Sequence, residues 1–224
     1  MSSSDSSSSS QDGGGGENRF ISWFCSLPGN NLFCQVEEEF IQDSFNLTGI
    51  SNRAYFDYAL DLILDVPLPV REHEISDSMR EVIENEAEVV YGLIHSRYII
   101  GPGLEQMFDK FIRGEFGRCP RFACGRYPLL PHGPHAFGES GVLFYCANCE
   151  EVYYPRYKRH LNIDGSFFGA NFVGLFLMTF WNSIPKRQSM REKSKQKWEP
   201  RVFGFKMHQS SEVWCRDRGG RGTL

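Results

Sequence analysis

The sequence predicts an α+β protein, in which an all-α N-terminal domain is followed by a four-cysteine zinc-ribbon domain with short antiparallel strands. Two observations carry this prediction. Apolar residues recur at helical spacing up to Gly114, and the pattern then changes to short strand-like runs separated by Cys, Pro and Gly. Four of the seven cysteines also fall in two close pairs within the second region.

The helical domain is expected at residues 20–114. Its clearest helix, Ser78–Ile100, has a continuous apolar stripe, and Ser78 is placed to cap its start with Glu81 completing a capping box. Gly101-Pro102-Gly103 should end this helix. Three shorter helices are expected at Val36–Asp43, Ala54–Asp65 and Leu104–Ile112.

The zinc-ribbon domain is expected at residues 115–208. Phe172–Trp181 fits either a short buried helix or a strand. Residues 1–19, rich in Ser and Gly, and residues 209–224 are expected to be flexible tails, because such compositions cannot build a core. Short strands are predicted at Val142–Cys146, Glu151–Tyr154 and Arg201–His208.

The charge is distributed unevenly along the chain. Residues 1–100 carry 17 acidic and 5 basic side chains, a net charge of −12, whereas residues 101–224 carry 11 acidic and 19 basic side chains, a net charge of +8. The two halves are therefore expected to attract each other or to meet different partners.

Membrane insertion and secretion are not expected. The chain opens on Met1 and a serine run rather than a secretory signal, and its longest apolar stretch, Phe172–Trp181, is too short to span a bilayer as a helix. We expect a soluble protein of the cytoplasm and nucleus, where reducing conditions favour metal binding by clustered cysteines over disulfides.

The cysteine spacing predicts a zinc site. Cys119 and Cys124 form a C-x4-C pair, 21 residues separate it from a C-x2-C pair, and Cys146 and Cys149 complete the set. Two such pairs supply four thiolates to one tetrahedral Zn²⁺ and leave no open position, so the ion should be structural. Four free buried thiols are the alternative. We interpret the nearby His132, His135 and His160 as ordinary polar residues, since four thiolates already satisfy the ion.

No catalytic motif is present. The chain lacks a P-loop, a kinase Gly-rich loop, a G-x-S-x-G elbow and an H-E-x-x-H pair. The dipeptide Asp164-Gly165 is typical of a turn, and we interpret it as a turn rather than as a catalytic feature. The sequence therefore predicts a non-catalytic protein.

Acidic residues follow two serines of the N-terminal tail. Asp5 lies three residues after Ser2, and Asp12 lies three residues after Ser9. A kinase that selects acids at this offset would phosphorylate both serines. The alternative is a solvated linker with no such role.

Several motifs resemble the casein kinase II regulatory beta subunit family. ISWFCSLPGNNLFCQVEEEFIQDSFNLTGI (21–50) is similar to the opening of that family, and YGLIHSRYI (91–99) resembles its signature helix. GRCPRFAC, YCANCEEVYYP, DGSFFG and RVFGFKMH follow in the family's order. The resemblance covers about residues 20–208.

The resemblance implies a regulatory subunit with no phosphotransfer activity of its own. It implies a homodimer formed through the zinc regions, which binds two casein kinase II catalytic alpha subunits to give a heterotetramer and modulates the kinase's stability and choice of protein substrates. It also implies that Phe203 and Phe205, with Leu175 as a further apolar contact, dock on the catalytic subunit. Without the resemblance, both phenylalanines would be interpreted as core.

The chain departs from the family pattern in three segments. The acidic loop that binds basic effectors such as polyamines is replaced by VPLPVREHEISDS (66–78). The segment QSMREKSKQKWEP (188–200) is longer and more basic, and the tail after His208 does not resemble the family's. These departures indicate a divergent paralogue.

A second hypothesis is a nucleic-acid-binding zinc ribbon. The run Lys186–Lys206 carries eight Lys and Arg residues against two acids, with Trp198 among them. Basic charge with an aromatic residue is typical of nucleic-acid binding. A solvated loop explains the same run, and the acidic helical half counts against a dedicated nucleic-acid binder.

Overall fold

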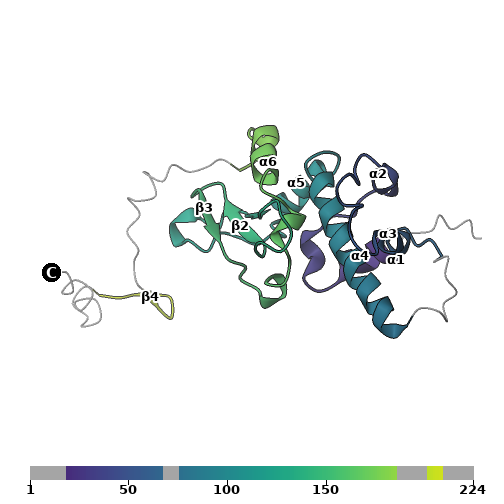
Figure 1. Cartoon of the computed structure of the whole chain (residues 1–224). Helices are drawn as coiled ribbons and strands as arrows, with labels where there is room; N and C mark the ends of the chain where they lie inside the picture. The colour runs from purple at the N-terminus through teal and green to yellow at the C-terminus, as the bar shows by residue number, and fades with distance from the viewer. Residues whose placement is uncertain (1–18, 68–75, 186–200, 209–224) are drawn as a thin grey trace, which may run out of the picture.

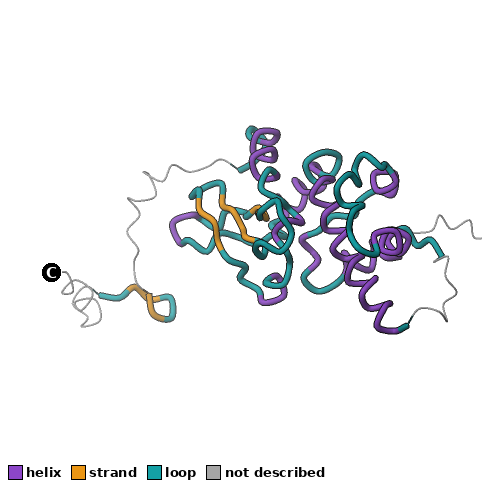
Figure 2. Tube along the Cα trace, viewed as in Figure 1, coloured by secondary structure: helices purple, strands orange, loops and turns teal. Residues whose placement is uncertain are grey.

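The computed structural model describes residues 19–67, 76–185 and 201–208 (Figure 1). The α-helices of residues 19–113 gather in one region, and the three-stranded sheet lies in another (Figure 2). None of the helices in these ranges is both long and apolar enough to cross a bilayer. The helical region contains α1 (Arg19–Ser26), α2 (Glu38–Gln42), α3 (Phe56–Ile63), α4 (Asp77–Tyr98) and α5 (Leu104–Arg113), with a 3₁₀ turn, η1 (Asn30–Leu32).

Helix α4 is the longest element and lies at the centre of the helical region (Figure 1). One of its faces is buried, as the apolar stripe predicts, although Val82 is half-exposed. The predicted cap is two residues too far along the chain, because Ser76 rather than Ser78 caps the helix. The extended backbone of Ser76 lets its hydroxyl accept from the Met79 N–H at 3.3 Å, whereas Ser78 already lies within the first turn.

The second region holds an antiparallel sheet in the order β1-β2-β3. Tyr145 of β2 lies opposite Leu130 on one side and Val152 on the other. The strand β1 is absent from the sequence prediction, because its central Pro131 reads as a strand breaker and is tolerated only at a sheet edge. The elements are β1 (Leu130–His132), β2 (Leu143–Cys146), β3 (Glu151–Tyr153) and the 3₁₀ turns η3 (Phe122–Cys124), η4 (Lys158–His160) and η5 (Gly165–Phe167).

The ambiguous apolar segment is a helix, α6 (Phe172–Phe180). Phe172 and Phe176 of this helix are fully buried, and Phe176 packs edge-on against Phe111 of α5 at 5.2 Å between ring centroids. Contact with a helix of the first region therefore decides the secondary structure that periodicity left open.

Arg201–His208 forms a hairpin, so the prediction of one continuous strand is wrong. Strands β4 (Arg201–Val202) and β5 (Phe205–Lys206) pair in antiparallel fashion. Phe203 and Gly204 form the two-residue turn between them, with φ angles of 48° and 85°. Such turns need positive φ at both central residues, which Gly204 adopts freely. Phe203 consequently lies at the tip rather than in a strand.

The helical and sheet regions share one contiguous core. Helix α4 packs directly against η5, where a side chain at Gly92 would place its Cβ 2.4 Å from the Phe167 ring. Glycine at this point therefore allows the close approach of the two segments. The boundary between separate domains at residue 114 stays a prediction.

Candidate metal centre and candidate docking residues

The four predicted zinc ligands come together in one buried cluster. The sulfur atoms of Cys119, Cys124, Cys146 and Cys149 all lie within 4.8 Å of one another. The Cys119 and Cys149 sulfurs are 3.7 Å apart, and the Cys124 and Cys146 sulfurs are 3.4 Å apart. A tetrahedral Zn²⁺ with bonds of about 2.3 Å to sulfur needs sulfurs about 3.8 Å apart. The cluster therefore has the donor type, number and spacing that zinc requires.

Backbone hydrogen bonds hold two of the ligands in place. Cys146 ends β2, and its carbonyl accepts from the Glu150 N–H at 2.8 Å, which closes the second knuckle. Cys119 is held by its own N–H, which donates to the Tyr127 carbonyl at 2.8 Å. Burial raises the pKa of the Cys146 thiol, so this group keeps its proton until a metal ion replaces it.

Two further side chains contact the sulfurs and were not singled out from the sequence. Asn148 donates its side-chain N–H to the Cys124 sulfur at 3.0 Å and to the Cys124 carbonyl at 3.2 Å. The Tyr153 hydroxyl lies 3.1 Å from the Cys149 sulfur. Donors of this kind orient thiolate ligands and offset their charge. Their position within and just after the second knuckle was the available signal.

The three neighbouring histidines lie outside the sulfur cluster, as expected. His160 is nonetheless buried, and its ring packs near Phe144 at 6.0 Å between centroids. Within the described residues, Nδ1 of His132 is buried and has no hydrogen-bond partner. Burial lowers the pKa of both His132 and His160.

A buried histidine of α4 is a structural residue that sequence reasoning missed. His95 is fully buried; its Nε2 accepts from the Cys34 N–H at 3.2 Å, and its Nδ1 lies 2.9 Å from the Phe167 carbonyl. A carbonyl only accepts, so Nδ1 carries the proton and donates. Desolvation lowers the pKa of His95 to about 4. The charge of Lys110 acts in the same direction, and the hydrogen bond to the Phe167 carbonyl acts in the opposite direction. His95 thus joins α4 to η5 as a neutral ring.

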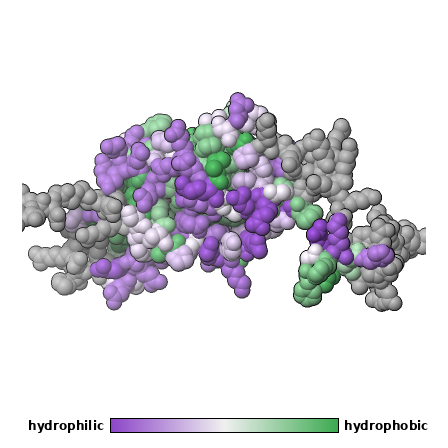
Figure 3. Space-filling model, turned by 180° about the vertical axis from the view of Figure 1, so that it is seen from behind, coloured by the Kyte–Doolittle hydropathy of each residue, from purple (hydrophilic) through white to green (hydrophobic). Residues whose placement is uncertain are grey.

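The predicted docking phenylalanines are exposed. Phe203 is 97% exposed and Phe205 is 79% exposed, so neither belongs to the core of the described chain. They give the hairpin an apolar tip (Figure 3). Leu175 lies on α6, where it is 39% exposed, and the hairpin lies well apart from this helix (Figure 1). The structure does not bring Leu175 together with the two phenylalanines.

Several predictions fall on residues outside the described ranges. These are the phosphorylation sites Ser2 and Ser9, most of the altered loop at 66–78 and residues 186–200 of the basic run at 186–206. They stay predictions.

The fold and the cysteine cluster together define a helical protein with a zinc-ribbon-type module. The sequence profile described as casein kinase II regulatory subunit matches residues 19–206. The chain belongs to the casein kinase II regulatory subunit family.

Curated relatives are similar in sequence to this chain over most of its length. It is 45% identical over 196 residues to casein kinase II subunit beta-3 of Arabidopsis thaliana, covering 86% of this chain and 68% of the relative. It is 44% identical over 198 residues to casein kinase II subunit beta' of Drosophila melanogaster, covering 87% of this chain and 86% of the relative. It is 36% identical over 197 residues to casein kinase II subunit beta' of Saccharomyces cerevisiae, covering 87% of this chain and 74% of the relative. The chain thus spans about two thirds of the plant relative's length.

Proposed function

We propose that this chain is a non-catalytic subunit that binds the catalytic alpha subunit of casein kinase II and modulates its stability and substrate choice. One observation carries the docking part of this proposal. The hairpin presents Phe203 in its two-residue turn and Phe205 at the start of β5, with both rings exposed to solvent. Exposed adjacent aromatic rings are typical anchors of protein interfaces, because they bury large apolar area at low entropic cost.

We propose further that the chain forms a homodimer through its zinc-binding region, with Zn²⁺ as a structural ion. Support comes from the apolar side chains exposed close to the cysteines in sequence. Phe122 lies between Cys119 and Cys124 and is 75% exposed, and Val152 and Tyr154, which follow Cys149, are 46% and 84% exposed. The strand β3 that carries Val152 is an edge of the sheet. Covering these side chains with a second copy would remove apolar surface from water.

The docking proposal predicts that Phe203→Ala combined with Phe205→Ala weakens binding to the catalytic subunit by at least about thirtyfold. Each substitution removes an exposed ring that only the partner would bury. Calorimetric titration of the double variant against purified catalytic subunit measures the change. Zinc content and dimerisation should be preserved, because both positions lie outside the cysteine knuckles.

Phe45→Ala is the matched control. Phe45 is also a highly exposed phenylalanine, 81% accessible, but it follows α2, and that helix lies far from the hairpin (Figure 1). Its loss should leave the affinity for the catalytic subunit within about twofold. Wild-type affinity in the double variant would refute the docking surface, and a chain that binds no catalytic subunit at all would refute the function.

We also propose that the serine-rich tail is phosphorylated by the bound kinase at Ser2 and Ser9. Asp5 and Asp12 supply the acidic residue three positions after each serine. Each phosphate adds a charge of about −1.5 to −2. Mass spectrometry after incubation with catalytic subunit and ATP should find phosphate at both sites, and Asp5→Asn should reduce it at Ser2 alone. An unmodified tail after prolonged incubation would contradict the proposal.

A further inference from the structure

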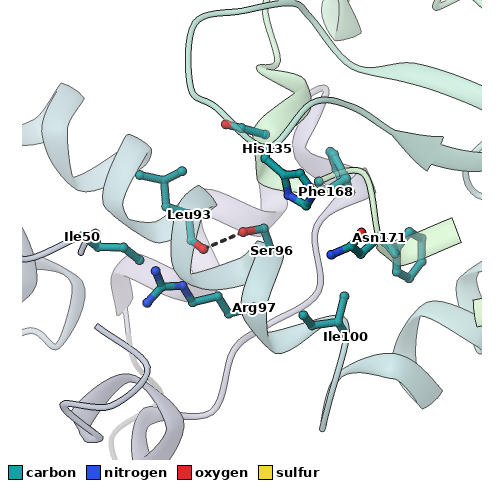
Figure 4. Close-up of a pocket in the computed structure, with 11 residues that line it drawn as sticks. Ile50, Leu93, Ser96, Arg97, Ile100, His135, Phe168 and Asn171 are labelled. Atoms are coloured by element: carbon teal, nitrogen blue, oxygen red, sulfur yellow. Dashed lines mark hydrogen bonds between the residues drawn. The ribbon is translucent and has the colours of Figure 1, made fainter. Parts of the chain in front are cut away.

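Two polar side chains that line the cavity between α4 and α6 are held by backbone carbonyls. The cavity measures about 240 Å³, and Ser96 on its wall donates to the Leu93 carbonyl at 2.7 Å (Figure 4). Arg97 donates to the Thr48 carbonyl, also at 2.7 Å. Both side chains therefore hold local segments of the fold together. Asn148 in the cysteine cluster differs from them, because one of its partners is a sulfur atom of the predicted zinc site.

Asn148 joins the two cysteine knuckles, the first at residues 119–124 and the second at residues 146–149. Its backbone belongs to the second knuckle, but its side chain reaches the first. The side-chain nitrogen lies 3.2 Å from the Cys124 carbonyl oxygen and 3.0 Å from the Cys124 sulfur. A carbonyl oxygen and a thiolate both accept hydrogen bonds, so the amide nitrogen rather than its oxygen faces them. Asn148 thus connects two ligand pairs that are distant in the sequence.

The Asn148 side chain is buried as well as bonded. The residue is 5% exposed, and a buried amide costs free energy unless its N–H groups have acceptors. The carbonyl and the sulfur of Cys124 supply these acceptors. A sulfur that has exchanged its proton for a metal ion is a stronger acceptor than a thiol, because it carries negative charge. The bond from Asn148 should therefore strengthen when zinc binds.

The first knuckle has the greater need of such a bond. Four residues separate its two cysteines, whereas two residues separate those of the second knuckle. Phe122 within the longer loop is 75% exposed, and the loop leaves Cys124 through Gly125 in the left-handed conformation. A longer loop has more conformational freedom to lose when its second ligand is fixed. A hydrogen bond from the second knuckle to Cys124 offsets part of this cost.

We propose that Asn148 is a positioning residue of the zinc centre, which holds Cys124 on the ion and lowers the reactivity of its sulfur. This inference rests on the zinc site of the proposed function and deepens it. Zn²⁺ with four thiolates has a net negative charge, and an N–H donor beside one sulfur offsets part of that charge. Electron density drawn into the hydrogen bond is less available to an electrophile. Zinc retention and the reactivity of Cys124 should therefore both depend on this amide.

Two substitutions in the full chain separate hydrogen-bond donation from shape. Asn148→Leu removes the donor at similar volume, and Asn148→Asp keeps the shape but places a carboxylate beside the Cys124 sulfur and carbonyl. Release of zinc to a chromophoric chelator should be about tenfold faster in Asn148→Leu and faster still in Asn148→Asp. A residue that only fills space would give the opposite order, since Asp resembles Asn in shape more than Leu does. That opposite order, or wild-type release from both variants, overturns the proposal.

Cobalt and an alkylating reagent report on the sulfur itself. In the Co²⁺-loaded chain, the thiolate-to-metal charge-transfer band should move to longer wavelength in Asn148→Leu, because loss of the hydrogen bond raises the energy of the sulfur electrons. In the zinc-loaded chain, N-ethylmaleimide with mass spectrometry should find the first modification at Cys124. Tyr153→Phe removes the hydroxyl that lies 3.1 Å from the Cys149 sulfur, so its first modification should fall on Cys149 instead. The same site of first modification in both variants would contradict the assignment of Asn148 to Cys124.

Asn162→Leu is the matched control. Asn162 is exposed and lies outside the sulfur cluster, so this variant should release zinc within about twofold of the wild-type rate. Equal acceleration by Asn162→Leu and Asn148→Leu would overturn the proposal. Metal analysis of the wild-type chain keeps two failures apart. A zinc-containing wild type whose release rate ignores Asn148→Leu overturns this inference alone, whereas a metal-free wild type overturns the zinc site on which the inference rests.

Discussion

Replacing Cys146 with serine should remove the zinc ion and unfold the sheet region. Cys146 is fully buried at the end of β2, and its sulfur lies 3.4 Å from that of Cys124. A hydroxyl is a poor zinc ligand, so the remaining three thiolates would hold the ion weakly. Metal binding supplies on the order of 10 kcal/mol of folding free energy in small zinc modules. Loss of the dimer should follow, because the proposed interface lies on the same region.

Metal analysis and light scattering measure these effects. The wild-type chain should contain about one zinc per chain and behave as a dimer, and the Cys146→Ser variant should be metal-poor and monomeric. Cys25→Ser is the matched control, because Cys25 lies outside the cluster and contacts the Tyr91 hydroxyl at 3.5 Å. That variant should keep its zinc. A wild-type protein that is dimeric and free of metal would refute the prediction.

The second large effect is a loss of stability in acid that depends on His95. The pKa of His95 in the folded chain is about 4, against an ordinary value of 6.5. Below pH 6.5, therefore, His95 is protonated in the unfolded chain but stays neutral in the folded chain. The free energy of unfolding consequently falls as the pH falls from 6.5 toward 4. From pH 7 to pH 4 this difference amounts to roughly 3 kcal/mol.

Comparison with a His95→Gln variant isolates this contribution. Zinc ligands also take up protons in acid, but they do so equally in both proteins, so the difference between the two pH profiles reports His95. We expect the variant to be less stable at pH 7, because it loses the paired bonds to Cys34 and Phe167, and to have a flatter profile between pH 6.5 and 4. Denaturant unfolding at several pH values measures this.

His135→Gln is the control for this experiment. His135 is exposed and makes no hydrogen bond to Cys34 or Phe167, so its profile should keep the wild-type slope. A His95→Gln variant with the wild-type slope would show that the buried ring does not control the acid sensitivity.

Much of the helical region could be predicted, because helices depend on local periodicity. The stripe of α4 and the stop near Gly114 are both visible in the sequence, and α4 and α5 lie where these signals place them. The hairpin was misjudged for a local reason: alternation of apolar residues looks the same in a strand and across a two-residue turn. The positive φ at Phe203 is the feature that distinguishes them.

The four zinc ligands could be predicted from the sequence alone, because two short knuckles each constrain a pair of thiols. The fold then brings the two pairs together, with the Cys124 and Cys146 sulfurs in contact across 22 residues. The motifs from residue 21 to residue 208 likewise determined the family, which the comparisons confirm. Only the tertiary structure could reveal the contacts between segments far apart in the chain. His95 meets Phe167 across 72 residues, and the cavity forms where α4 faces α6. No local pattern encodes such encounters, because packing of the shared core decides which side chains are left facing one another.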